Sequence, residues 1–284
     1  MAATMPHDGN NGTAETDDGT ARSRWASEKR ILIGVVPLDA VTFKDAVDRA
    51  LSFIERKGTA APARIVCPNA SLVVLADADE AYAKIIGSCE LVVADGLPLV
   101  WAASLLRTPL PGQVRGVDLM EAVCAAGGAS GMSFFILGGL TGAAERAAER
   151  LTQRNPGLCV AGIHCPPIGF EADPAANQRV REKIVAAAPD FLIVALGSPK
   201  QERWIFENFR DLPVGAIQGV GAAVDTAAGL RRRPAPWMRS MGLEWLGRLI
   251  CEPRRLWRRY LFGNARFLYI VFRQWLGSWR TELS

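Results

Sequence analysis

Asp95 is one candidate for acid–base catalysis, because it follows the apolar run Leu91–Ala94 and precedes Gly96. A carboxylate just past a buried strand faces a cleft, and the glycine allows the chain to turn there. Partial burial raises the pKa of a carboxyl group and suits it to general-base work. An ordinary turn aspartate is the competing interpretation, and the pattern alone leaves it open.

Two glycine-rich turns are candidate phosphate sites. Gly138 and Gly139 begin the segment 138–142, between a predicted strand and a predicted helix, and Gly219 and Gly221 follow a later strand. Backbone N–H groups at a helix start bind phosphate. Because segment 138–142 matches neither GxGxxG nor GxxxxGK[ST], a tight strand-to-helix turn explains it equally well.

Other polar residues have plainer explanations. Lys200 and Gln201 open a predicted helix after Pro199, which is an ordinary helix start, although both side chains are able to bind phosphate or sugar. Asp77 and Asp79 form a DxD pair, but they fall inside a predicted helix, where a solvated face is the simpler explanation. With no further acidic or histidine cluster in the sequence, we predict a site without a metal.

These residues need a scaffold, and the sequence predicts one in which strands and helices alternate. That order is typical of parallel βαβ units, so we predict an α/β fold with a Rossmann-like parallel sheet flanked by helices. Ligands of such sheets bind at the carboxyl ends of strands. The predicted strands are Ile31–Val36, Arg64–Cys67, Leu91–Ala94, Ser133–Leu137, Cys159–Ile163, Phe191–Leu196 and Val214–Gln218. The predicted helices are Thr42–Arg56, Ser71–Ile86, Pro98–Leu106, Asp118–Ala126, Gly142–Arg154, Pro174–Ala188 and 199–209.

The composition narrows the class of protein. The 284 residues are 49% hydrophobic and 22% charged, as in globular proteins. Six cysteines without CxxC spacing fit a reducing compartment, and two histidines leave little for a His-built metal centre. The polar N-terminal residues lack the apolar stretch of an export signal, so we expect a disordered tail over 1–28, a cytoplasmic location and no transmembrane helix.

Charge is distributed unevenly along the chain. Residues 231–284 hold twelve arginines and three acids, a net charge of +9, so residues 1–230 sum to −5. We predict a catalytic domain over 29–230 and a basic amphipathic appendage over 231–284. In Leu243–Leu261, apolar side chains fall on one helical face and arginines on the other. Such a segment suits an anionic membrane surface, while nucleic-acid binding or simple packing on the body are the alternatives.

A series of short motifs resembles the WecG/TagA/CpsF glycosyltransferases, glycosyltransferase family 26. The resemblance spans about residues 30–270. The motifs, in order, are Cys67–Ala70, Ala94–Gly96, Arg115–Leu119, Gly138-Gly139, Gly197–Glu202, Gly219–Gly221 with Asp225, and Glu244-Trp245 with Arg248, Glu252 and Pro253. It implies a membrane-associated, metal-independent, inverting enzyme without a cofactor. Its substrates would be a UDP-sugar donor and a sugar carried on polyprenyl diphosphate. The enzyme would act at the inner leaflet of the cell membrane. The resemblance implies no nucleic-acid partner and is compatible with a homo-oligomer.

The resemblance also implies roles for individual residues. Asp95 becomes the preferred base, which takes the proton of the acceptor hydroxyl as UDP leaves, and Asp118 is the rival base. Asn69 and Gln201 are expected to bind sugar hydroxyls, and Asp225 the ribose or the uracil. The further expected substrate contacts are Gly96, Gly138, Gly139, Gly219 and Gly221. The arginines expected at the diphosphate or the lipid headgroup are Arg248, Arg255, Arg258 and Arg259.

The substrate subclass is less constrained. The segment His164–Phe170 looks like that of members building xanthan-type exopolysaccharides, which favours glucosyl transfer to a glucosyl-diphosphate lipid. Transfer of N-acetylmannosamine or its uronate, for teichoic acid or enterobacterial common antigen-type glycans, is the alternative, and Cys67 stands where the family commonly has threonine. From another class, a nucleic-acid-binding protein using the Arg/Trp appendage stays open. A nicotinamide oxidoreductase fits less well, because GxGxxG with a following ribose-binding acid is absent.

Overall fold

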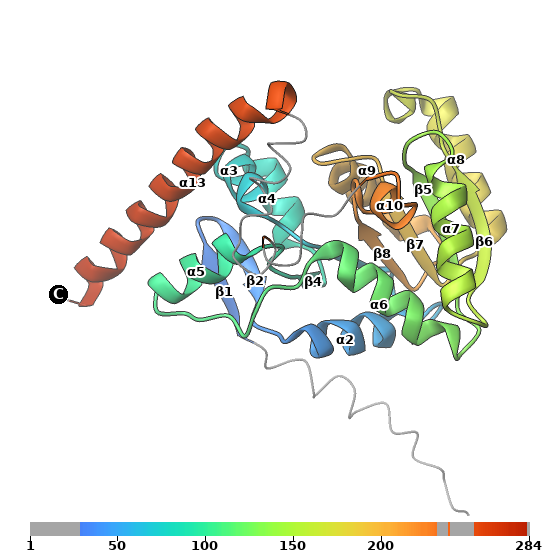
Figure 1. Ribbon diagram of the computed structural model, residues 1–284, viewed down its shortest axis with the longest axis horizontal. Coiled ribbons are helices and arrows are strands. Elements are labelled where there is room, and N and C mark those ends of the chain that lie inside the picture. Colours follow the sequence, from blue (N-terminus) through green and yellow to red (C-terminus); the bar gives the residue numbers. More distant parts are fainter. Residues whose placement is uncertain (1–28, 232–237, 239–252, 283–284) are drawn as a thin grey trace, which may run out of the picture.

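The computed structural model describes residues 29–231, 238 and 253–282 (Figure 1). The predicted tail over 1–28 and the first part of the predicted amphipathic segment, including Arg248, lie outside the described residues. The fold prediction is confirmed, because the described chain forms an α/β structure whose central sheet has six parallel strands in the order β4-β3-β8-β7-β5-β6. The strands are β3 (Ala63–Val66), β4 (Leu91–Val92), β5 (Ser133–Gly138), β6 (Cys159–His164), β7 (Phe191–Ala195) and β8 (Ala216–Gly219).

Helices cover both faces of this sheet. Successive strand residues face opposite sides, so Phe134 packs in one hydrophobic cluster and Phe135 in another. The helices of the first face are α2 (Phe43–Glu55), α6 (Gly116–Gly128), α7 (Ala143–Arg154) and α10 (Ala223–Ala227). Those of the second face are α3 (Ala70–Ala78), α4 (Glu80–Gly87), α5 (Leu97–Leu105), α8 (Pro174–Ala187) and α9 (Lys200–Asn208), with the short turns η1 (Phe170–Ala172) and η2 (Phe209–Asp211).

The predicted helix Ser71–Ile86 is two helices. Asp79 interrupts it in an extended conformation (φ −136°, ψ 99°), and its side chain accepts a hydrogen bond from the Tyr82 N–H as the N-cap of α4. A short acceptor side chain competes with the helical backbone in this way. Arg203 of α9 holds the same carboxylate at 2.5 Å, so a contact distant in sequence stabilises the break.

The apolar run Ile31–Val36, predicted to be one strand, is an antiparallel hairpin instead. Its strands are β1 (Arg30–Ile33) and β2 (Val36–Asp39), and the turn uses Gly34 at φ +61°, a conformation that glycine adopts readily. Buried Asp39 ties the hairpin to the central sheet, because its carboxylate accepts the Val92 N–H at 2.7 Å and pairs with Arg30 at 2.8 Å.

The C-terminal helix α13 (Pro253–Glu282) packs against α3 and the hairpin (Figure 1). Phe267, Ile270 and Val271 are buried in the same hydrophobic cluster as residues of α3, α4, α5 and the hairpin. Asp77 on α3 binds Arg266 at 3.0 Å and Arg273 at 2.8 Å. The predicted solvated face for the DxD pair was therefore wrong, because the side chain of Asp77 is only 5% exposed.

Within the part of the chain that the structure describes, no helix combines the length and the apolar character that a membrane crossing requires.

Candidate active site

A crevice is expected at the carboxyl edge of the sheet between β3 and β8. These two strands pair with each other, yet the helices that follow them lie on opposite faces. Leu72 of α3 packs on the second face, and Val224 of α10 packs on the first. Ligands of open parallel sheets bind where the connections diverge in this way. The predicted residues of the catalytic domain stand at this edge, at the strand ends, on the loops that follow them or in the first turn of the next helix.

Asp95 and Asn69 lie on the neighbouring loops after β4 and β3. The Asp95 N–H donates to the Pro68 carbonyl oxygen at 2.8 Å, which holds the two loops together, and the side chain of Asp95 is half-buried. The Asn69 carboxamide oxygen caps α3 by accepting the N–H groups of Ser71 and Leu72, at 3.0 and 3.3 Å. Asn69 therefore has a structural task beside the sugar contact predicted for it.

The start of α6 meets the end of β3 at the same edge. Gly116 is so close to Cys67 that a Cβ atom at position 116 would lie 3.3 Å from the Cys67 Cβ. Gln218 on β8 joins both, because its Nε2 donates to the Gly116 carbonyl oxygen at 2.9 Å and to the Cys67 sulfur at 3.7 Å. Asp118, the rival base, forms an ion pair with Arg115 at 2.9 Å.

The charge of Asp95 acts on the Cys67 thiol. Burial raises the pKa of the Cys67 thiol well above its usual range, and the negative charge of Asp95 raises it further. The Cys67 thiol is therefore neutral. Because the thiol stays protonated, it is not a nucleophile at neutral pH.

Gln201 connects the loops that follow β7 and β8. Its Oε1 accepts the N–H groups of Gly197 and Gly221, at 3.2 and 2.9 Å, and the side chain is only 3% exposed. Gly219 leaves room for it, since a Cβ there would lie 3.0 Å from the Gln201 Nε2. The amide that was predicted to bind a sugar hydroxyl is thus already bound within the chain.

The neighbouring Glu202 is a buried acid that binds the side chain of Gln201. The Oε1 of Glu202 accepts hydrogen bonds from Ser198 Oγ at 2.7 Å and from Gln201 Nε2 at 2.8 Å. Its Oε2 and the Tyr82 hydroxyl are both buried without a hydrogen-bond partner within the described residues. Burial raises the pKa of the Glu202 carboxyl, against the effect of its hydrogen bonds. Burial and the charge of Glu202 also raise the pKa of Tyr82, so the two groups influence each other.

The glycine turn after β5 is fastened to α10. Asp225, only 6% exposed, accepts the Leu140 N–H at 3.2 Å and pairs with Arg231 at 3.4 Å. Gly138 (φ +92°) and Gly139 (φ +100°) have conformations that favour glycine. A Cβ on Gly138 would lie 2.6 Å from the Ala195 carbonyl oxygen of β7, so close approach of two strand ends requires glycine here.

The structure thus gathers the predicted residues along one edge of the sheet, in the strand order β4, β3, β8, β7 and β5. It does not place the side chains of Arg255, Arg258 and Arg259, which lie outside the residues whose side chains are described. His164 ends the edge strand β6, 3.2 Å from Lys183, and burial together with that charge lowers its pKa.

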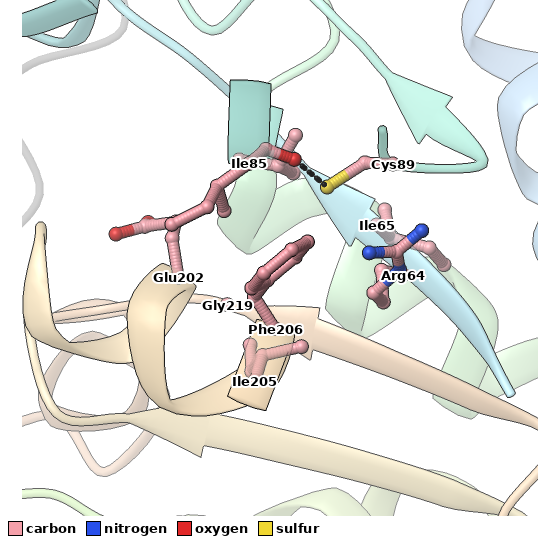
Figure 2. Close-up of a pocket in the computed structure, with 9 residues that line it drawn as sticks. Arg64, Ile65, Ile85, Cys89, Glu202, Ile205, Phe206 and Gly219 are labelled. Carbon is pink, nitrogen blue, oxygen red and sulfur yellow. Dashed lines mark hydrogen bonds between the residues drawn. The ribbon is translucent and has the colours of Figure 1, made fainter. Parts of the chain in front are cut away.

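A separate small pocket lies between β3, α4, α9 and the end of β8 (Figure 2). Its lining is mainly apolar, with Arg64, Cys89 and Glu202 as the polar contributors. Arg64 already binds Glu90 at 2.8 Å, and Asp95 does not line the pocket, so we assign it no substrate group. Among the described residues, no three His, Cys, Asp or Glu side chains are grouped so that they could hold a metal ion.

Sequence reasoning missed Gln218, Glu202 and Tyr82. Gln218 had a usable signal, because it is an amide at the end of the otherwise apolar run 214–218, and the structure shows that it is fully buried. Glu202 had the pattern of an ordinary first-turn acid, and Tyr82 the pattern of a helical core residue. Only the packing of α4 against α9 brings these two together.

Fold and site together are those of an α/β protein with polar side chains gathered at the carboxyl edge of a parallel sheet, where ligands of this architecture bind. The model of the glycosyl transferase WecG/TagA/CpsF family matches residues 31–281, and the chain belongs to this family of glycosyltransferases. Similar curated proteins include the N-acetylglucosaminyldiphosphoundecaprenol N-acetyl-beta-D-mannosaminyltransferases of Staphylococcus aureus strains COL and MW2. Each is 28% identical over 239 residues, which cover 84% of this chain and 91% of the relative.

Proposed function

We propose that this protein transfers N-acetylmannosamine from a UDP-sugar to N-acetylglucosamine carried on a polyprenyl diphosphate. The names of the relatives support this acceptor and this sugar, and the family resemblance supports the UDP donor. The glucosyl preference drawn from the segment His164–Phe170, and with it the xanthan-type subgroup, gains no support from these relatives. The N-acetylmannosaminyl alternative replaces it.

The observation that carries the proposal is the position of Asp95. It is half-buried at the carboxyl end of β4, one strand away from the divergence between β3 and β8. A base there takes the proton from the acceptor hydroxyl while that oxygen attacks the anomeric carbon, and UDP leaves from the opposite face. From an α-linked donor this single displacement gives a β product, the configuration in the relatives' name.

The leaving diphosphate needs donors that stabilise its charge. The loops after β5 and β8 are candidates, because Gln201 fixes the backbone of Gly221 and Asp225 fixes that of Leu140. Their positions are set before substrate arrives, so little reorganisation accompanies the reaction. The arginines of residues 231–284 are the second source of positive charge, and we propose that this segment meets the membrane where the lipid-linked acceptor resides.

The test is transfer of labelled sugar to a short-chain polyprenyl diphosphate carrying N-acetylglucosamine, with EDTA present. The donors are UDP-N-acetylmannosamine, its uronate and UDP-glucose. We expect transfer from the first, and a loss of about 10²–10⁴ in turnover in Asp95→Asn. The matched variant Asp118→Asn should keep most activity. Transfer only from UDP-glucose would reject N-acetylmannosamine as the transferred sugar. A loss of turnover confined to Asp118→Asn would reject Asp95 as the base. Absence of transfer together with salt-sensitive nucleic-acid binding would reject the enzyme.

A further inference from the structure

Three neighbouring elements expose large apolar side chains. On α5, Trp101 is 55% and Leu105 53% exposed. The other members lie on the hairpin and on α13 and are about half exposed or more. We call the whole set the apolar patch, and it consists of Leu32, Val35, Trp101, Leu105, Leu268, Tyr269, Phe272 and Leu276.

Helix α5 shows that this exposure is unusual. Its sequence, LPLVWAASL, contains no charged residue. Leu99, Ala102 and Ala103 face the core, while Trp101 and Leu105, one turn apart, face outward. A helix that is apolar on all sides is normally enclosed by protein or lies against another apolar phase. Among the described residues nothing covers the outward face of α5.

The three elements that carry these side chains are neighbours, and α5 contacts β1 of the hairpin. The hairpin contacts α13 directly, because Gln274 accepts the Gly34 N–H at 2.7 Å and donates to the Leu32 carbonyl oxygen at 2.8 Å. Gly34 also lies against Ile270, since a Cβ there would be 2.9 Å from that side chain. In Figure 1, α5, the hairpin and α13 form one side of the molecule, opposite α7, β6 and α8.

The patch adjoins the candidate active site through the chain itself. Gly96 is the N-cap of α5, and Asp95 is the residue before it. Asp39 anchors the hairpin to β4, the strand that leads to Asp95. The predicted base and the apolar patch are therefore held by the same elements, so any surface that covers the patch lies beside the catalytic edge.

We infer that the apolar patch rests on an anionic lipid bilayer, and that the catalytic body itself, through Trp101, Leu105 and the hairpin, supplies part of the membrane contact. The inference rests on the proposed function, in which the acceptor is anchored in a membrane. Tryptophan, tyrosine and leucine beside a basic segment are the composition of an interfacial surface. Residues 231–284 carry a net charge of +9, which favours anionic headgroups.

A second copy of the chain fits the patch less well. In a two-fold dimer the same surface meets itself, so the two copies of α13 would approach each other. Each belongs to a segment of charge +9, and like charges brought together oppose association. An anionic bilayer compensates that charge while it covers the apolar side chains.

The experiment compares the full-length protein with the double variant Trp101→Ser/Leu105→Ser in co-sedimentation with phosphatidylglycerol vesicles and with phosphatidylcholine vesicles. The matched control is Ile168→Ser/Val185→Ser, which also removes two exposed apolar side chains, 100% and 48% exposed, but outside the patch. We expect the α5 variant to bind phosphatidylglycerol vesicles about tenfold more weakly and the control to bind like the wild type. Binding to phosphatidylcholine should be weaker for all three proteins.

Turnover on a water-soluble short-chain acceptor, without vesicles, separates this inference from the proposed function. We expect the α5 variant to retain that activity, because neither side chain lies in the site. Unchanged vesicle binding by the α5 variant would overturn the inference, even if transfer proceeds as proposed. So would loss of binding only in Leu268→Ser/Phe272→Ser, since α13 alone would then be the anchor. A wild-type dimer that the α5 variant converts to a monomer, at equal vesicle binding, would assign the patch to a second copy.

Discussion

Replacing Gln201 with alanine tests whether this side chain binds sugar or fixes the loops. The change removes the acceptor of the Gly197 and Gly221 N–H groups and the donor to Glu202. Each lost backbone hydrogen bond costs about 1 kcal/mol, and the lost bond to a carboxyl group about 1.5–3 kcal/mol. We therefore expect Gln201→Ala to lower the free energy of unfolding by about 4 kcal/mol, or the melting temperature by about 10 °C.

Thermal unfolding and initial-rate kinetics together distinguish the two roles. A positioning residue should lower both stability and kcat, since the backbone of both loops is released. Gln201→Glu keeps an acceptor oxygen but places a second acid beside Glu202, so it should recover only part of the loss. Lys200→Ala is the neighbouring control, since its ion pair with Glu171 is half exposed and worth less than about 1 kcal/mol.

A different outcome would refute this reasoning. If Gln201→Ala keeps the melting temperature of the wild type and raises only the KM for the donor, the side chain binds the sugar directly. The internal hydrogen bonds would then be exchanged for substrate on binding, as the family resemblance predicts.

Three further changes probe separate parts of the structure. Asp77→Ala removes both ion pairs to α13 and should lower the free energy of unfolding by about 1–2 kcal/mol. Amide hydrogen exchange in residues 263–277 should become faster. Unchanged exchange would contradict the role of Asp77 in anchoring α13. In urea unfolding, Gly138→Ala should lower the free energy of unfolding by about 2–6 kcal/mol, because of backbone strain and the clash with Ala195. Gly142→Ala should cost less than half as much, since Gly142 also has a positive φ (+74°) but lies in open space. Glu202→Gln should gain stability relative to the wild type as pH rises from 4 to 8. Because its pKa is raised in the folded state, the Glu202 carboxyl stabilises the wild type at low pH, and this contribution is lost as the group ionises. Parallel pH profiles of stability for the variant and the wild type would contradict a raised pKa of Glu202.

Local patterns predicted the elements whose causes are local. Short apolar runs located the strands of the central sheet, and Thr42 starts α2 with a capping box as its sequence indicates. The hairpin was missed because Gly34 sits within an otherwise apolar run, where only pairing between Ile33 and Val36 reveals the turn.

The candidate site was predictable as a place but not as a set of contacts. The rule for parallel sheets predicted that Asp95 and Asn69 lie at the carboxyl edge of the sheet, which is where the structure has them. It could not show that Asp225 binds the backbone at Leu140, 85 residues earlier, or that Asp77 binds arginines of α13, 189 and 196 residues later. Such partners depend on the packing of the complete fold, about which periodicity and spacing along the chain carry no information.

The position of β8 has a consequence for folding. It is the last strand of the sheet in sequence, yet it lies between β3 and β7. Until β8 is inserted, β3 and β7 each have an open edge. The pairing of β3 with β8 joins residues about 150 positions apart in sequence, such as Ala63 and Ala216. Contacts of such long sequence separation slow folding, and open strand edges favour aggregation. We therefore expect a chain truncated before Ala216 to aggregate rather than to form half of the sheet, and the active-site loops to form only when β8 closes it.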